Sequence, residues 1–277
     1  MKMEVNEGAF GSSRTGVVSY RRSVGFIASS DSLAVEEPLA IDVVGPDLKV
    51  ERVGAIMRTP VMDRYLVAGF LYSEGFISGA SDIKSIDGIG EDGISHHNHA
   101  TVAIRNSIGF RVNSRLVNSA CGVCGRSTIA DLLIRHRRIE TDARIDAKTI
   151  LDLPSEMNRL QNLFLITGGV HAAALFDLDG DIREVCEDIG RHNAVDKIIG
   201  YTLMEHENTE NRVIMVSGRA GFEIVEKAFI AGFPIVVSVS APSSLAVQVA
   251  ESVGITLVCF VRENRFTVYS HPDRVIP

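Results

Sequence analysis

Residues 163–277 alternate short apolar runs with helical patterns, and this alternation constrains the fold more than any other feature of the sequence. The runs at 212–217 and 234–240 are apolar almost throughout, as in strands that are covered on both faces. Strands that alternate with helices predict a largely parallel or mixed sheet with helices on both faces. Ligands of such a sheet bind at the loops that follow its strands. The expected strands are 171–177, 182–186, 212–217, 234–240, 256–261 and 265–270, and the expected helices are 191–205, 222–232 and 243–254.

The part of the chain before this domain predicts a smaller α+β module at residues 35–118. A helix is expected to begin with Thr59 as its N-cap and Pro60 at its first position, and to end at Gly75. Two strands before the helix are separated by turn residues and therefore predict a hairpin. The expected strands of this module are 39–44, 48–57, 100–105 and 110–115.

Two further segments complete the organisation of the chain. Residues 1–34 show no sustained periodicity, which predicts a flexible segment with one strand at 16–22. Residues 119–162 hold a cysteine loop and two bridging helices. Ser127 is the expected cap of the first bridging helix, and Pro154 is expected to break the second.

Composition excludes several classes of protein. The 277 residues are 45% hydrophobic, which is enough for a substantial core, yet no window reaches the roughly 18 apolar residues of a membrane span. The start lacks the apolar stretch of a secretory signal, so we expect a cytoplasmic protein. A formal net charge of −7 argues against general nucleic-acid binding, and an anionic ligand therefore needs a local site.

The loop SACGVCGRS is the strongest local indication of chemistry. Cys121 and Cys124 are separated by two residues, and each is followed by a glycine that adds little bulk around the sulfur atom. Arg115 and Arg126 would favour the thiolate, which is the nucleophilic form of cysteine. The loop therefore predicts reactive cysteine chemistry, whereas four cysteines in all are too few for a disulfide scaffold.

The residues of this loop leave several functions open. A persulfide relay requires one accessible nucleophilic cysteine. A structural zinc site would need further ligands, which His96, His97 and His99 could provide. A thioredoxin-like redox pair or two unreactive surface thiols are the remaining interpretations.

Six motifs in a fixed order resemble the FdhD family of formate dehydrogenase accessory sulfurtransferases, and the similarity runs from about Val35 to the end of the chain. Their number and order make the resemblance far more specific than a CxxC pair alone. The motifs are GFLYSEGFI at 69–77, CGVCG at 121–125, TGGVHAAALF at 167–176, EDIGRHNAVDK at 187–197, SGRAGFEIVEKA at 217–228 and RFTVYSHPDRV at 265–275.

The resemblance implies a function and an architecture. Members of this family accept sulfur from a cysteine desulfurase as a persulfide and pass it to the bis-guanine-dinucleotide molybdenum cofactor before that cofactor enters formate dehydrogenase. Cys121 matches the persulfide-bearing cysteine and Cys124 a supporting one. The resemblance also implies a homodimer whose larger module, residues 163–277, is a three-layer α/β/α domain of the cytidine-deaminase type with a mixed sheet.

The resemblance and the chemistry of the residues together predict where the molybdenum cofactor binds. Arginine side chains suit its phosphates, glycines allow close backbone approach, and the start of a helix favours an anion. The family contact corresponds to Phe260, Val261, Arg262, Glu263, Asn264 and Arg265. The further candidates are Thr167, Gly168, Gly169, His171, Asp188, Arg191, His192, Ser217 and Arg219.

Two other functions remain as alternatives. The protein could be a non-catalytic chaperone that binds the molybdenum cofactor while Cys121 is incidental. A zinc-dependent deaminase needs HxE or CxE followed by PCxxC, but Cys186 precedes Glu187 directly and no PCxxC follows, so no zinc is expected.

Overall fold

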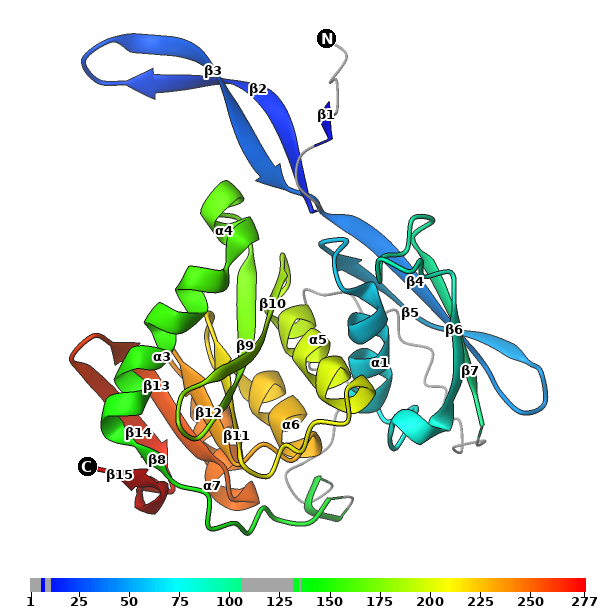
Figure 1. Ribbon diagram of the computed structural model, residues 1–277, viewed down its shortest axis with the longest axis vertical. Helices are drawn as coiled ribbons and strands as arrows, with labels where there is room; N and C mark the ends of the chain where they lie inside the picture. The colour runs from blue at the N-terminus through cyan, green and yellow to red at the C-terminus, as the bar shows by residue number, and fades with distance from the viewer. Residues whose placement is uncertain (1–5, 8–10, 106–131, 135) are drawn as a thin grey trace.

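The computed structural model describes residues 6–7, 11–105, 132–134 and 136–277. They form a projecting two-stranded arm, a smaller α+β module and a larger α/β module (Figure 1). Within the described residues, no helix is long and apolar enough to cross a membrane. The cysteine loop, the predicted strand at 110–115 and the start of the first bridging helix, with its expected cap Ser127, lie outside the described residues.

The arm corrects the prediction of a flexible start with one strand at 16–22. Strand β2, Ser12–Arg21, pairs antiparallel with β3, Gly25–Ala34, along their whole length. The short strand β1, Asn6–Glu7, pairs with the base of β2. Small and polar residues dominate both strands, so their sequence lacks the apolar alternation by which half-buried strands are predicted.

The smaller module has a four-stranded sheet in the order β5-β4-β7-β6, with one long helix packed against it. The hairpin and the strand near 100–105 are confirmed, but β6 was not predicted. Its elements are β4, Glu37–Val44; β5, Val50–Arg58; α1, Asp63–Ser73; the 3-10 helix η1, Ala80–Asp82; β6, Ile83–Asp87; and β7, His99–Ile104.

Helix α1 begins later than predicted, after Met62 rather than after Thr59. Thr59 does not cap it, because its groups bind the other module. Its amide donates to Asp188 Oδ2 at 3.2 Å, and its hydroxyl accepts from the amide of Ile189 at 3.1 Å. The threonine therefore ties the two modules together.

The second bridging segment forms two helices, α3, Ala147–Leu160, and α4, Asn162–Thr167. The predicted break at Pro154 is wrong, since α3 runs through it and ends at Gln161. Ile150, Leu153 and Met157 bury one face of α3 in the core, and this packing holds the helix together across the proline. Asp146 caps α3 by accepting from the amide of Lys148 at 2.7 Å.

The larger module confirms a mixed sheet with helices on both faces. Its order is β10-β9-β11-β12-β13-β14, with β11, β12 and β13 parallel and the other pairs antiparallel. Helix α3 covers one face, and α5, α6 and α7 cover the other (Figure 1). The strands are β9, His171–Asp177; β10, Ile182–Asp188; β11, Arg212–Val216; β12, Ile235–Ser238; β13, Thr256–Arg262; and β14, Arg265–Ser270. The helices are α5, Arg191–Met204; α6, Phe222–Ile230; and α7, Ser244–Val253.

Three short elements follow the larger sheet or lie beside it. Strand β8, Ile145–Asp146, pairs in parallel with β15, Val275–Ile276. The 3-10 helix η2, Pro272–Arg274, leads into β15. The end of the chain thereby joins the start of α3.

Helices α1 and α5 join the two modules at a close crossing. A Cβ at Gly69 would lie 1.8 Å from the carbonyl oxygen of Asp196, and one at Gly200 would lie 1.8 Å from that of Tyr65. Only glycine allows backbones to approach so closely. Beside this crossing, the fully buried Lys197 Nζ contacts Asp188 Oδ2 at 2.6 Å and the carbonyl oxygen of Thr59 at 3.2 Å.

Candidate functional site

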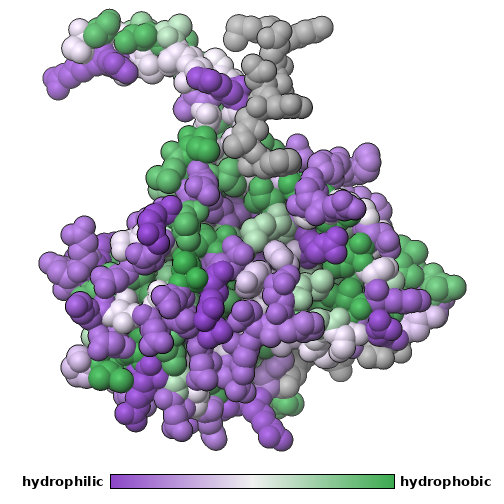
Figure 2. Space-filling view, viewed as in Figure 1, coloured by the Kyte–Doolittle hydropathy of each residue, from purple (hydrophilic) through white to green (hydrophobic). Residues whose placement is uncertain are grey.

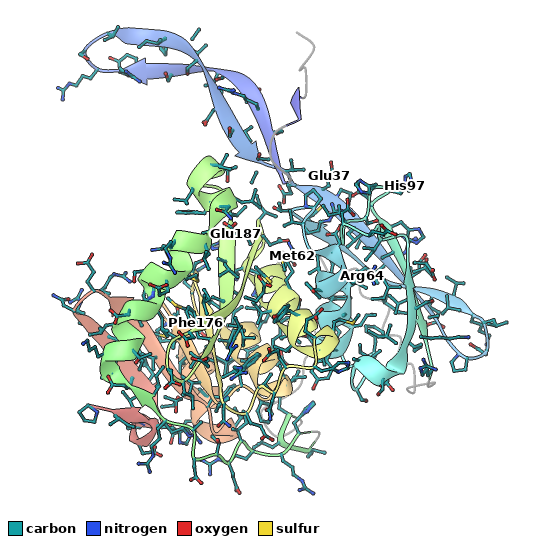
Figure 3. All side chains as sticks on the ribbon, in the orientation of Figure 1. Glu37, Met62, Arg64, His97, Phe176 and Glu187 are labelled. Carbon is teal, nitrogen blue, oxygen red and sulfur yellow. The ribbon has the colours of Figure 1, made fainter. Side chains whose placement is uncertain are left out.

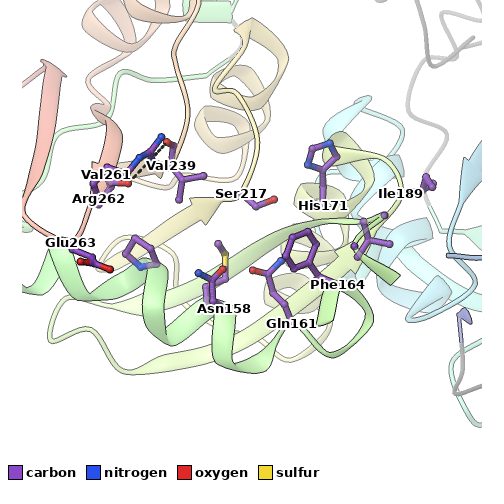
Figure 4. A pocket seen from close by; sticks show the side chains of 15 residues that line it. Asn158, Gln161, Phe164, His171, Ile189, Ser217, Val239, Val261, Arg262 and Glu263 are labelled. Carbon is purple, nitrogen blue, oxygen red and sulfur yellow. Dashed lines mark hydrogen bonds between the residues drawn. The ribbon is translucent and has the colours of Figure 1, made fainter. Parts of the chain in front are cut away.

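A cleft of about 710 Å³ opens between α3, α4 and the strand ends of the larger sheet (Figure 4). It lies where ligands of open α/β sheets commonly bind. Its walls combine apolar side chains with a few amide, carboxylate and basic groups. The lining residues are Pro154, Met157, Asn158, Gln161, Phe164, Gly168, Gly169, Val170, His171, Ile189, Ser217, Val239, Val261, Arg262 and Glu263.

The cleft brings together seven of the predicted site residues, although 95 positions separate the first from the last. Gly168 ends α4 with a left-handed φ of 64°. Ser217 follows β11, and its hydroxyl accepts from the amide of Ala172 at 2.9 Å, which fixes the neighbouring strand end. These seven are Gly168, Gly169, His171, Ser217, Val261, Arg262 and Glu263.

His171 is half-buried at the start of β9 and faces a basic surrounding. Burial lowers the pKa of its imidazole below the usual value, and the nearby charges of Arg191, His192 and Arg219 lower it further. The ring is therefore neutral at neutral pH and can donate or accept a hydrogen bond. The charge of Asp188 acts in the opposite direction but is the smallest of these influences, and the positive charge of the two arginines suits an anion.

The turn between β13 and β14 forms the other end of the cleft. Arg262 Nη1 donates to the carbonyl oxygens of Val239 and Val261, the latter at 2.8 Å, and Figure 4 shows the guanidinium folded toward Val239. Phe260 has a left-handed φ of 55°, an unfavourable conformation for an aromatic residue. Strain of this kind gathers at functional sites.

A second hollow of about 280 Å³ lies beside this turn. It is lined by Phe260, Arg262, Arg265 and Thr267, so Arg262 borders both spaces. Two arginines beside an exposed aromatic ring can hold a phosphate and a planar ring. Asn264, at the turn itself, lines neither space.

Besides Asn264, five predicted residues line neither the cleft nor the second hollow. Asp188 is fully buried, and both of its carboxylate oxygens are used by the protein: Oδ1 accepts from Gly190 and Asn193, and Oδ2 from Thr59 and Lys197. It is thus a structural residue of the module junction. The other four are Thr167, Arg191, His192 and Arg219.

Three of these four still act close to the cleft. Arg191, His192 and Arg219 influence His171 through their charge. His192 Nε2 lies 3.0 Å from Glu223 Oε2. Thr167 Oγ1 donates to the carbonyl of Leu163 at 2.7 Å and so supports the end of α4.

The prediction missed the wall formed by α3 and α4. Pro154, Met157, Asn158 and Gln161 have the spacing of one helix face, and this periodicity could have shown that they share a surface. Glu187, labelled in Figure 3, positions this wall from β10. Its carboxylate accepts from the amides of Leu163 and Phe164, both at 2.8 Å, at the start of α4.

The cysteines of the larger module are unsuited to nucleophilic chemistry. Cys186 and Cys259 are buried in the core between the sheet and α5, α6 and α7. Burial raises the pKa of the Cys259 thiol to about 12 and that of Cys186 well above its usual value. Both thiols therefore stay protonated. Cys121 and Cys124 lie outside the described residues.

Two of the three histidines in the predicted cluster contact carboxylates. His96 Nε2 lies 2.8 Å from Asp92 Oδ2, and His99 Nε2 lies 2.8 Å from Asp42 Oδ2. Within the described ranges, no three histidine, cysteine or acidic side chains are grouped as metal ligands would be. A zinc site that combines these histidines with the cysteine loop also requires Cys121 and Cys124, which lie outside those ranges.

The fold and the cleft define a two-module α/β protein with a ligand-sized cleft between its larger sheet and helices α3 and α4. The FdhD/NarQ family model matches residues 34–276. A sulfur carrier protein FdhD from Thermoplasma acidophilum is 72% identical over 277 residues, which cover 100% of this chain and 98% of that protein. Its counterpart from Thermoplasma volcanium is 48% identical over 271 residues, 94% of this chain and 97% of the relative. The chain therefore belongs to the FdhD/NarQ family, which confirms the resemblance.

A solved structure agrees with this assignment. A crystal structure assigned to a formate dehydrogenase accessory protein from Desulfotalea psychrophila matches with a TM-score of 0.73 and 26% sequence identity. The match covers 96% of this chain and 99% of that chain. The two chains thus share their fold over almost their whole length.

Proposed function

We propose that this protein is a sulfurtransferase that carries sulfur as a persulfide on Cys121. Its sulfur donor is a cysteine desulfurase, and its substrate is the bis-guanine-dinucleotide molybdenum cofactor of a formate dehydrogenase. The names of the relatives, sulfur carrier proteins, support the general role. The observation that carries the proposal is the burial of Cys186 and Cys259, because it leaves Cys121 and Cys124 as the candidates for a sulfur carrier.

The loading step needs only a thiolate. Cys121 attacks the outer sulfur of the donor's persulfide, a new S–S bond forms on Cys121, and the donor leaves as a thiolate. Attack of Cys124 on Cys121 would instead release hydrosulfide and leave a disulfide. Cys124 can therefore either support delivery or discharge the carrier.

The cleft supports the proposed substrate. A volume of about 710 Å³ suits a drug-sized or nucleotide-sized group. Arg262 and Arg265 offer charge-assisted hydrogen bonds to phosphate oxygens. We further propose that the larger module shares its fold with cytidine deaminases, which the three layers and the mixed sheet support.

Intact mass spectrometry after incubation with a cysteine desulfurase and cysteine tests the loading step. The wild-type chain should gain one sulfur atom, and peptide mapping should place it on Cys121. Cys121→Ala should lose this gain, whereas the matched variant Cys259→Ala should keep it. Loading on Cys186 or Cys259 would overturn the proposal.

Nucleotide binding tests the cleft separately, with guanosine diphosphate as the probe. Because each arginine–phosphate contact is charge-assisted, Arg262→Ala and Arg265→Ala should each weaken binding by roughly tenfold to a hundredfold. Cys121→Ala should bind the probe normally. If Cys121→Ala also matures active formate dehydrogenase, the protein is a cofactor-binding chaperone and not a sulfurtransferase.

A further inference from the structure

One polar side chain in the wall of the cleft is buried and has no partner within the protein. Gln161 is only 2% exposed, yet its side-chain amide makes no hydrogen bond with any residue that the structure describes. The amide has one oxygen acceptor and two N–H donors, and folded proteins rarely leave such groups buried without partners. Gln161 lines the cleft, so its amide is available to a ligand that binds there.

The backbone around Gln161 holds this side chain in position. Gln161 ends α3 and begins α4: its backbone amide donates to the carbonyl of Asn158 at 3.3 Å, and its carbonyl accepts from the amide of Leu165 at 3.0 Å. The Glu187 carboxylate fixes the start of α4 by accepting from two further amides. Side chains on such rigid elements keep their geometry before a ligand arrives. The amide of Gln161 is therefore preorganised.

The side chain beside Gln161 in the cleft is aromatic. Figure 2 shows apolar surface over α4, and the ring of Phe164, which is 44% exposed, is the part of it that lines the cleft. In Figure 4 the Gln161 amide and the Phe164 ring lie next to each other and point from the helices toward the wall that holds Ser217 and His171. An exposed aromatic ring favours a flat ligand, on which it can stack.

The wall formed by α3 and α4 is uncharged where it meets the cleft. Arg262, which suits a phosphate, lies at the other end, in the turn between β13 and β14. A phosphate therefore fits that turn, and a neutral group fits beside Gln161. The described residues with which α3 and α4 and the turn after α4 line the cleft are Pro154, Met157, Asn158, Gln161, Phe164, Gly168 and Gly169.

A carboxamide pairs well with a ring edge that carries a donor beside an acceptor, because its oxygen and its N–H group then form two hydrogen bonds side by side. A lactam edge, a ring N–H next to an exocyclic oxygen, has this pattern. We propose that the cleft binds a lactam heterocycle, with its N–H and oxygen paired to Gln161 and its face stacked on Phe164. This inference rests on the proposed function, whose substrate carries a lactam edge both in guanine and in the pterin.

Binding of two probes, measured by calorimetry, tests the contact with Gln161. The probes are guanosine diphosphate and 6-hydroxymethylpterin, and each is compared with its derivative methylated at the lactam nitrogen. Gln161→Leu should weaken binding of the unmethylated ring that occupies the cleft by roughly tenfold to a hundredfold, because both hydrogen bonds are lost. The methylated ring should bind weakly, and equally to both proteins. Phe164→Ala should instead weaken both forms of the ring alike, since stacking does not involve the ring N–H.

The matched control is Gln248→Leu, the same change at the only other glutamine of the chain. Gln248 is exposed on α7 and does not line the cleft, so this variant should bind both probes as the wild type does. Without a ligand, Gln161→Leu should melt no lower than the wild type, because it removes a buried amide that has no partner among the described residues. A lower Tm would make Gln161 a structural residue and overturn the proposal.

The two probes also identify the ring. Loss of guanosine diphosphate binding in Gln161→Leu assigns guanine to the cleft, whereas loss of pterin binding alone assigns the pterin and leaves the nucleotide to the hollow beside Phe260. The proposal is overturned if neither probe binds, if Gln161→Leu binds both as the wild type does, or if it weakens the methylated rings equally. Sulfur loading on Cys121 enters none of these measurements, so failure of this proposal is distinguishable from failure of the proposed function.

Discussion

Replacement of Gly69 by alanine tests the close crossing of helices α1 and α5, because it adds one methyl group at the contact. The new Cβ would lie 1.8 Å from the carbonyl oxygen of Asp196 and 2.8 Å from the amide nitrogen of Gly200. Both atoms belong to the backbone of α5, so no side-chain rotation relieves the clash. The helices would have to separate by about 1.6 Å to restore an ordinary contact of 3.4 Å.

The magnitude follows from three contributions. Overpacking a core costs about 1–3 kcal/mol, and movement of two backbones places this site at the upper end. Separation also weakens the hydrogen bond from Ser73 Oγ to Asp196 Oδ1, now 2.8 Å, by about 1 kcal/mol. Alanine in place of glycine returns about 1 kcal/mol of helix propensity. The expected net loss is about 3 kcal/mol, a decrease in Tm of about 6–12 °C.

Urea unfolding and calorimetry of Gly69→Ala measure this loss. The control is Gly16→Ala in β2, where a Cβ meets nothing within 4 Å and where we expect almost no change. Gly200→Ala should behave like Gly69→Ala, because its Cβ would clash with the carbonyl oxygen of Tyr65. The double variant should lose less than the sum, since one separation of the helices serves both methyl groups. Equal stability of Gly69→Ala and Gly16→Ala would refute the reasoning.

Three further predictions concern buried or partly buried groups. Lys197→Met should lower the free energy of unfolding by about 3–5 kcal/mol in urea, because it leaves the Asp188 carboxylate buried without its cation. Adding Asp188→Asn should recover part of this loss, since it removes the unpaired charge. Cys186 and Cys259 should react with a disulfide reagent only on unfolding, and rapid labelling of either in the folded chain would contradict their burial. In an NMR titration, the pKa of His171 should lie below about 6.5, because burial disfavours the charged imidazole. The unfolded chain then binds the proton more readily than the folded one, so the free energy of unfolding should fall as the pH drops from about 6.5 toward the folded pKa. His171→Gln should remove this pH dependence.

The strands of the larger module could be predicted well because their signal is local. Runs such as 171–177 and 265–270 match β9 and β14 to the residue. Apolar strands between helices leave few alternative arrangements, so the mixed sheet followed from the pattern as well. The ends of these strands then placed Ser217 and His171 in one cleft.

The failures arose where distant parts of the chain decide local structure. Thr59 looks like a helix cap, but the amide of Ile189 and the carboxylate of Asp188 occupy its polar groups. Pro154 looks like a helix break, but α3 continues past it because one face of the helix is buried against the sheet. Gly69 gives no signal in the sequence, since its role exists only once α5 is in place. Such contacts are set by tertiary packing and leave no periodicity of their own.

The left-handed conformation of Phe260 leads to a last prediction: at this position asparagine should stabilise the fold more than valine, the reverse of their usual order in strands. Valine is normally favoured in strands and asparagine is not. At a φ of 55°, however, a β-branched residue is strained, whereas asparagine tolerates the left-handed region. Phe260→Asn should therefore be more stable than Phe260→Val by about 1 kcal/mol in urea unfolding.

Phe266 in β14 provides the matched control for this comparison, because it lies in the paired strand and its φ is not positive. There, the valine variant should be the more stable of the two. If valine is the better residue at both positions, the turn at Phe260 is not strained. If the order reverses at Phe260 alone, the backbone there is held by its surroundings: the amide of Phe260 donates to the carbonyl of Ser240 at 3.1 Å, and Arg262 holds the carbonyl of Val239. Both variants should then weaken guanosine diphosphate binding alike, since each removes the aromatic ring from the hollow that Arg262 and Arg265 share.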